Sequence, residues 1–263
     1  MVSSNSILFM ILSFIISAVV PLIAIVFLKK KYNISIKSVI VGALTFFICV
    51  MLLEGTINKL ILNYNSTTSK LFKNPLNYML YVGIMAGIFE ETGKFIVFKY
   101  ILKKDRSFKN GITYGLGYGF MEALFLVGFT SINNIITAFQ INSGAFDKLL
   151  QIEGVPVESL VYLRNQMIYA PSYIWGFAGL ERISIFIIQM ALCILVLYAV
   201  KEKKYMYFIL AILLHSSIDF PVALYQIGYI NSLAFVEEFL IIVAILAIIF
   251  LIKISKIFKK SVV

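Results

Sequence analysis

Apolar runs of about 20 residues recur along the whole chain, and they constrain the fold more than any other feature. An α-helix needs roughly 20 mostly apolar residues to cross the hydrocarbon core of a bilayer. With 61% hydrophobic and 14% charged residues, the composition also departs from that of soluble domains. We therefore expect an all-α, polytopic membrane bundle of about seven transmembrane helices in a single domain, 1–263. The expected spans are 7–28, 38–62, 78–101, 111–137, 178–199, 205–228 and 232–252.

Lys and Arg gather in alternate loops between these runs, at 29–37, 103–109, 201–204 and 253–260. Cytoplasmic loops of membrane proteins carry an excess of positive residues. The pattern predicts an outside N-terminus and a cytoplasmic C-terminus, and it explains the formal charge of +10 without a nucleic-acid partner. The long connection 138–177 is then extracytoplasmic, and its apolar spacing predicts either an amphipathic interfacial helix or a partial cap over the bundle.

Ionisable residues inside the spans are the next constraint, because a charge near the bilayer centre is costly and usually has a function. Glu90, Glu91, Glu122 and the only histidine, His215, lie at a similar depth on three different spans. A layer of carboxylates and an imidazole contributed by three helices indicates a site. Five other ionisable residues fall toward the outer ends of their spans, where water lowers the cost: Glu54, Glu181, Arg182, Glu237 and Glu238.

Helical spacing pairs several of these groups. Lys94 follows Glu90 by four residues and Glu91 by three, so it can neutralise either carboxylate. One lysine leaves one net negative charge at the glutamate pair, and two close carboxyls resist ionising together. An acid and a base in one place are what hydrolytic chemistry requires.

The later spans contain two more pairs at a spacing of four residues. The Tyr118 phenol can reach the Glu122 carboxylate, and Asp219 can orient the His215 imidazole. The alternative for the first pair is a packing seam with one neutral glutamic acid, because small residues recur every fourth position on that span and let a neighbouring helix approach. These small residues are Gly111, Gly115 and Gly119.

The motifs, in this order, resemble the YhfC branch of the intramembrane protease superfamily that includes CAAX prenyl endopeptidases, bacteriocin-processing membrane proteases and PrsW. "EETGK" at 90–94 is similar to an EExGR-like element, and "GLGYGFME" at 115–122 to a GxGHGxxE-like element. "ER" at 181–182 and "HSSID" at 215–219 match the branch's ER and HxxxD-like elements. The resemblance covers roughly residues 80–220.

The resemblance implies roles for these residues. Glu90 would be the general base that activates water, with Glu91 beside it, and His215 would stabilise the oxyanion or hold the water in line. Lys94, Tyr118, Glu122, Gln189 and Asp219 would support or orient them, and Glu181 with Arg182 would lie behind that layer or form a plain interfacial ion pair.

Two departures from the pattern bear on a metal. Tyr118 and Gln189 stand where the branch has histidines, so a multi-histidine zinc site is excluded. A divalent metal such as zinc would have to use His215 with carboxylates, the candidates being Glu90, Glu91 and Glu122, a set poorer in the nitrogen and sulfur ligands that zinc favours. The glutamate–water mechanism requires no metal.

The resemblance implies an intramembrane endopeptidase of the bacterial plasma membrane that hydrolyses a peptide bond of a membrane-anchored or hydrophobic peptide. The missing histidines leave an alternative, a catalytically degenerate relative that acts as a peptide-binding, immunity or regulatory protein. Buried Glu, Lys and His also build proton relays, so a proton-coupled transporter is a third hypothesis. Against it, the sequence shows no inverted repeat.

Overall fold

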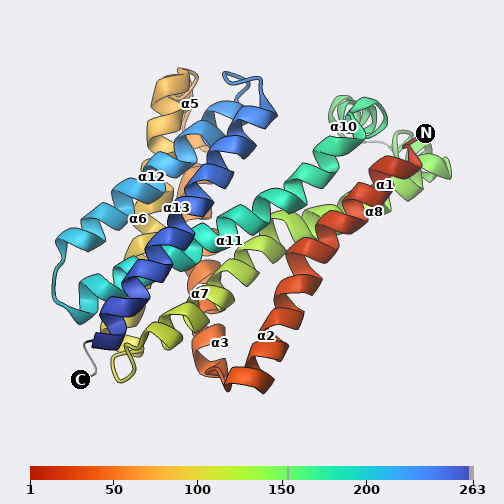
Figure 1. Ribbon diagram of the computed structural model, residues 1–263. Helices are drawn as coiled ribbons and strands as arrows, with labels where there is room; N and C mark the ends of the chain where they lie inside the picture. The colour runs from red at the N-terminus through yellow and green to blue at the C-terminus, as the bar shows by residue number, and fades with distance from the viewer. Residues whose placement is uncertain (153, 261–263) are drawn as a thin grey trace. The chain divides into compact units, whose positions relative to one another are not determined.

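The computed structural model describes residues 1–152 and 154–260, and its regular structure there is helical throughout (Figure 1). This confirms the all-α prediction. The helices are α1 Ser4–Phe14, α2 Val20–Tyr32, α3 Ile36–Phe46, α4 Gly55–Asn58, α5 Ser66–Leu71, α6 Pro75–Ile96, α7 Phe108–Ala123, α8 Phe129–Asn142, α9 Ala145–Leu149, α10 Val157–Tyr169, α11 Ser172–Lys201, α12 Met206–Gln226 and α13 Leu233–Lys260. Wider, π-helical turns continue several of them, at Ile15–Val19, Phe47–Glu54, Lys59–Tyr64, Val97–Ile101 and Leu124–Gly128.

Six helical runs within the described residues are long and apolar enough to cross a membrane. They confirm an integral membrane protein built as a helical bundle. The third predicted span, 78–101, corresponds to α6, which is 22 residues long but is not in this set and carries three of the buried charges. Seven crossings and the predicted orientation therefore stay predictions. The six runs are Ser4–Tyr32, Ile36–Tyr64, Phe108–Asn142, Ser172–Lys201, Met206–Gln226 and Leu233–Lys259.

Local sequence signals set the ends of the helices that matter most for the site. Asn74 caps α6: its side-chain oxygen accepts hydrogen bonds from the backbone N–H groups of Leu76 at 3.0 Å and Asn77 at 3.3 Å. Pro75 follows at the first helical position, where its missing N–H is not needed. Gly228, at φ 72°, follows the end of α12 in the left-handed conformation that glycine adopts without a steric penalty.

The chain forms two compact units, and the first comprises residues 1–24 and 123–183. Asn142 at the end of α8 holds the N-terminus, because its side chain exchanges hydrogen bonds of 2.7 and 3.0 Å with the backbone of Val2. The predicted helix in the segment 138–177 is present as α10, although its place at the membrane interface stays a prediction. The buried core of this unit consists of Val2, Met10, Ala138, Ile141, Phe146 and Met167.

The second unit comprises residues 25–122 and 184–263 and contains the paired helices α6 and α12 (Figure 1). Glycines on α6 allow these helices to approach closely. A Cβ added at Gly83 would lie 2.6 Å from the Phe220 ring, and one added at Gly87 would lie 2.5 Å from the Ser216 hydroxyl. Helix α6 is therefore held against the stretch of α12 that carries His215.

The predicted glycine seam on α7 packs against α11 in the same unit. A Cβ at Gly111 would meet Leu197 at 2.5 Å, and one at Gly119 would meet Phe186 at 2.8 Å. Gly115 lies between them, with Met190 at 3.2 Å. The seam fixes the distance between α7 and α11, the two helices that carry Tyr118 and Gln189.

Candidate functional site

Three ionisable residues of α6 lie on its buried face in the second unit. Glu91 and Lys94 are completely buried, and the side chain of Glu90 is 8% exposed. Their spacing of one, three and four residues places all three within about one turn of the helix. The two glutamates and the lysine predicted to interact are therefore together.

Lys94 is held by contacts from three helices. Its Nζ lies 2.7 Å from Glu91 Oε1 and 3.8 Å from Glu90 Oε2 on its own helix. It donates a hydrogen bond of 2.6 Å to Gln189 Oε1 on α11, and it lies 4.5 Å from the centroid of the Tyr118 ring on α7. The cation is neutralised and fixed in position, as a buried charge requires.

The two oxygens of Glu90 have different surroundings. Oε2 accepts hydrogen bonds from the Tyr118 hydroxyl at 2.8 Å and from Gln189 Nε2 at 2.9 Å. Oε1 faces His215 Nε2 at 3.7 Å, beyond hydrogen-bond length. The residues at the two positions where histidine was expected therefore orient the Glu90 carboxylate through one oxygen and leave the other facing the imidazole.

His215 on α12 is oriented by Glu91. The imidazole Nδ1 lies 2.6 Å from Glu91 Oε1, and because a carboxylate can only accept, Nδ1 carries the proton. Nε2 faces both Glu90 Oε1 and Asp219 Oδ2, the latter at 3.5 Å, and in the neutral imidazole it keeps a lone pair. The sequence had predicted Asp219 as the orienting carboxylate, whereas the structure gives the shorter contact to Glu91.

The exposed fraction of the side chains rises across the cluster. It is zero at Glu91 and Lys94, 6% at His215 and 27% at Asp219. The more exposed side of the cluster is therefore the side that Glu90 Oε1, His215 Nε2 and Asp219 face, and it is called the opening below. Water or a substrate would reach these atoms before it reached Lys94.

A divalent metal fits this opening by the chemistry of its donors. One ligand atom from each of Glu90, Glu91 and His215 lies within 4.8 Å of the others, with the Glu91 oxygen on the Nδ1 side of the imidazole. Glu90 Oε1 and His215 Nε2 lie 3.7 Å apart. This is comparable to the distance between two ligand atoms that are each bonded to one zinc ion at about 2.0–2.2 Å. A metal-bound histidine also characteristically donates its other N–H to a carboxylate, as His215 is placed to do toward Glu91.

Charge and hydrogen bonding favour the same conclusion. Glu90, Glu91 and Asp219 are opposed by Lys94, so the ionised cluster with a neutral imidazole has an excess of negative charge that a divalent cation would balance. In the described part of the chain, Glu91 Oε2 is buried without a hydrogen-bond partner. The residues present therefore fit a metal held by one imidazole and carboxylates.

The remaining residues predicted for the site are Glu122, Glu181 and Arg182. Glu122 is buried one turn beyond Tyr118 on α7, but the Tyr118 hydroxyl donates to Glu90, so the predicted Tyr118–Glu122 hydrogen bond is not the one formed. Glu181 and Arg182 belong to the first unit, where they form an ion pair with each other. Their supporting role and that of Glu122 stay predictions.

Two of the residues that were predicted to lie at water-accessible span ends are buried, so this prediction is wrong for them. Glu54 and Glu237 are both buried, at 6% exposure, whereas Glu238 is exposed as expected. Glu54 Oε1 accepts a hydrogen bond of 3.2 Å from Asn58, which in turn accepts one of 2.8 Å from the Tyr81 hydroxyl on α6. Depth along a span could not reveal this burial, because it depends on a neighbouring helix.

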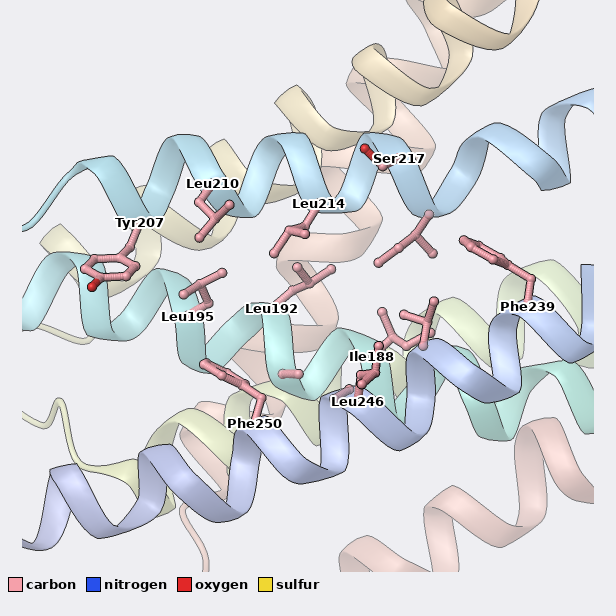
Figure 2. A pocket seen from close by; sticks show the side chains of 14 residues that line it. Ile188, Leu192, Leu195, Tyr207, Leu210, Leu214, Ser217, Phe239, Leu246 and Phe250 are labelled. Carbon is pink, nitrogen blue, oxygen red and sulfur yellow. The ribbon is translucent and has the colours of Figure 1, made fainter.

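A separate apolar groove lies among α11, α12 and α13 in the second unit (Figure 2). Its volume is about 460 Å³, and Leu192, Leu214 and Phe250 point into it. Ser217, which also lines it, is two residues from His215, or about 200° around the helix. Leu214 and Ile218 line it as well, so the groove and the carboxylate cluster use different faces of α12.

Comparison with known proteins identifies the family. The sequence model of the YhfC intramembrane metalloprotease family matches residues 16–241. A protein of Bacillus subtilis (strain 168), named uncharacterized membrane protein YhfC, is 38% identical over 259 residues, which are 98% of this chain and 100% of that protein. No solved structure matches. Because the family match spans the carboxylate cluster and the relative aligns almost end to end, the chain belongs to the YhfC intramembrane metalloprotease family.

Proposed function

We propose that this protein is an intramembrane endopeptidase of the bacterial plasma membrane that hydrolyses a peptide bond of a membrane-anchored or hydrophobic peptide. The observation that carries the proposal is the pairing of Glu90 Oε1 with His215 Nε2 across 3.7 Å inside a membrane protein. Both atoms face the same opening. The other carboxylate oxygen of Glu90 is held by Tyr118, and the other ring nitrogen of His215 is held by Glu91. The family description supports the same reaction class.

Glu90 is the proposed proton acceptor. Tyr118 and Gln189 hold its Oε2, so Oε1 is aimed at the opening, where it takes a proton from water. The water oxygen attacks the carbonyl carbon of the peptide, the C–N bond breaks, and Glu90 returns the proton to the leaving amine. A carboxylate that serves first as base and then as acid contributes about 10²–10⁴-fold to such a reaction.

Glu91 and Lys94 are proposed to position His215. Glu91 accepts a hydrogen bond from the Nδ1 proton, so that a neutral imidazole presents its Nε2 lone pair to the opening, and Lys94 donates to the same Glu91 oxygen. In a metal-dependent form of the reaction, a divalent ion held by His215 Nε2 with Glu90 and Asp219 carboxylate oxygens would polarise the scissile carbonyl and acidify the attacking water, in place of proton transfer to Glu90 Oε1. In its absence His215 and Asp219 would hold the water beside Glu90.

A non-catalytic relative that binds a peptide without cutting it is the second candidate. The observation that favours it is the degree to which Glu90 is already engaged: Tyr118, Gln189 and Lys94 all contact its Oε2. A buried polar network with its members paired is also what a purely structural core contains. Binding and cleavage must therefore be measured separately.

The test uses the full-length protein in liposomes with a library of hydrophobic and lipidated peptides, and cleavage is read by mass spectrometry. We expect Glu90→Gln to lower the rate by about 10²–10⁴-fold. Glu238→Gln, exposed on α13, is the matched control and should stay within about twofold, since surface charges contribute little. Unchanged cleavage in Glu90→Gln would refute the assignment of the base, and tight binding without cleavage would establish the non-catalytic candidate.

A further inference from the structure

Two neighbouring cavities of the second unit meet at the first turn of α7. The first, called here the basic pocket, has a volume of about 600 Å³. The second, the apolar pocket, has a volume of about 490 Å³. Phe108 and Lys109 line both. The other residues of the basic pocket are Ser107, Lys201, Ser255, Phe258 and Lys259.

The basic pocket gathers positive charge from three helices. Lys109 is in the first turn of α7, Lys201 is the last residue of α11, and Lys259 is in the last turn of α13. Among the described residues no carboxylate lines this cavity, and neither Lys109 nor Lys259 has an ion-pair partner there. Lys201 lies 4.6 Å from the centroid of the Phe258 ring. The cavity is therefore suited to an anion.

Helix stability accounts for two of these lysines but not for the third. A lysine in the last turn of a helix interacts favourably with the negative end of the helix dipole, which explains Lys201 and Lys259. Lys109 lies at the opposite end of its helix, where the dipole is positive and a cation is unfavourable. Nearby Asp105 accepts a hydrogen bond of 3.1 Å from the Ser107 backbone N–H and does not line the cavity. An anionic ligand would offset this repulsion.

The apolar pocket adjoins the basic pocket and offers hydrophobic walls to a ligand that has a charged end and a hydrocarbon part. Leu28 and Tyr32 of α2 and Ile112 and Leu116 of α7 form its walls. These helices are parts of two of the runs that are apolar enough to cross the membrane. A ligand that filled both cavities would have a charged end among lysines at the helix ends and a hydrocarbon part beside α7.

We propose that the two pockets together form a binding site for an anionic phospholipid, with the phosphate in the basic pocket and an acyl chain in the apolar pocket. Basic pockets between transmembrane helices at the membrane surface are suited to anionic headgroups. A free phosphate would use only the lysines and leave the adjoining apolar cavity empty. The shared wall of Phe108 and Lys109 therefore favours the lipid.

The test measures lipids retained by the purified full-length protein in native mass spectrometry, with dioleoyl phosphatidylglycerol and dioleoyl phosphatidylcholine offered in equal amounts. We expect the wild type to prefer phosphatidylglycerol. In the triple variant Lys109→Gln/Lys201→Gln/Lys259→Gln this preference should fall on the order of a hundredfold, or about fivefold for each lysine removed. The control Lys103→Gln/Lys104→Gln/Lys256→Gln removes the same charge from exposed positions outside the pocket and should keep the preference. Equal losses in both variants, or no loss in either, would overturn the site.

Two further measurements separate binding from folding and lipid from phosphate. Lys109→Gln alone removes an unfavourable charge from a helix N-terminus, so it should fold at least as well as the wild type while losing about fivefold in preference. If it unfolds more easily and keeps the preference, the role assigned to Lys109 is wrong. Inorganic phosphate at millimolar concentration should leave the lipid bound. Full displacement of the lipid by phosphate would mean that the site binds a soluble phosphate ligand and not a lipid.

Discussion

Two pairs of oppositely charged neighbours, Glu91 with Lys94 and Glu181 with Arg182, differ in what surrounds them. Both form ion pairs within their own unit of the structure. Lys94 is fully buried and is also bonded to Gln189 on another helix, whereas the side chains of Glu181 and Arg182 are 20% and 11% exposed. Glu181 and Arg182 are adjacent in the sequence, so their ion pair needs no other helix. The contacts of Lys94 come from three helices and therefore depend on the tertiary structure.

Breaking the buried pair should give the larger effect on stability. Lys94→Met leaves Glu91 without its cation in a water-free interior, and removing one partner of a buried pair costs about 3–5 kcal/mol. The free energy of unfolding in mixed detergent micelles, titrated with sodium dodecyl sulfate, measures this. Lys99→Met, one turn further along the same helical run, should cost no more than about 1 kcal/mol, the value of a cation–π contact. Equal losses in the two variants would mean that the cluster does not depend on its cation.

The positioning of His215 by Glu91 should have an intermediate effect that appears in function. Glu91→Gln removes the carboxylate that fixes the imidazole, and losing such a partner typically lowers metal affinity or activity by about 10–100-fold. Zinc affinity, measured by competition with a chelator, and peptide cleavage should fall together. Glu238→Gln serves again as the control. If affinity and cleavage survive in Glu91→Gln, His215 is oriented by another group.

The smallest effect is expected at the other pair. Arg182→Gln removes a partly exposed ion pair, and such pairs contribute about 0.2–1 kcal/mol. The same detergent titration applied to this variant should show a shift within that range, with cleavage unchanged. A loss as large as that of Lys94→Met would show that Arg182 takes part in a network of its own, and the contrast between the two pairs would fail.

Helical periodicity predicted much of the cluster but not its internal contacts. The spacing of Glu90, Glu91 and Lys94 predicted that the three side chains interact on one helix, and the structure confirms that they meet on α6. Tyr118 was expected to reach Glu122, one turn away, yet its hydroxyl donates to Glu90 on another helix. Contacts within a helix follow from sequence spacing, whereas those between helices depend on which faces pack together.

The sequence by itself determined that this is a helical membrane protein, because runs of about 20 apolar residues have few other folds open to them. It also determined which residues are chemically capable, since one histidine and a few carboxylates within the apolar runs leave little choice. The tertiary structure alone decided that Glu91 orients His215, that Tyr118 and Gln189 hold Glu90, and that Glu54 is buried. Those relations arise from close helix packing, which glycines such as Gly87 permit through contacts far apart in the chain.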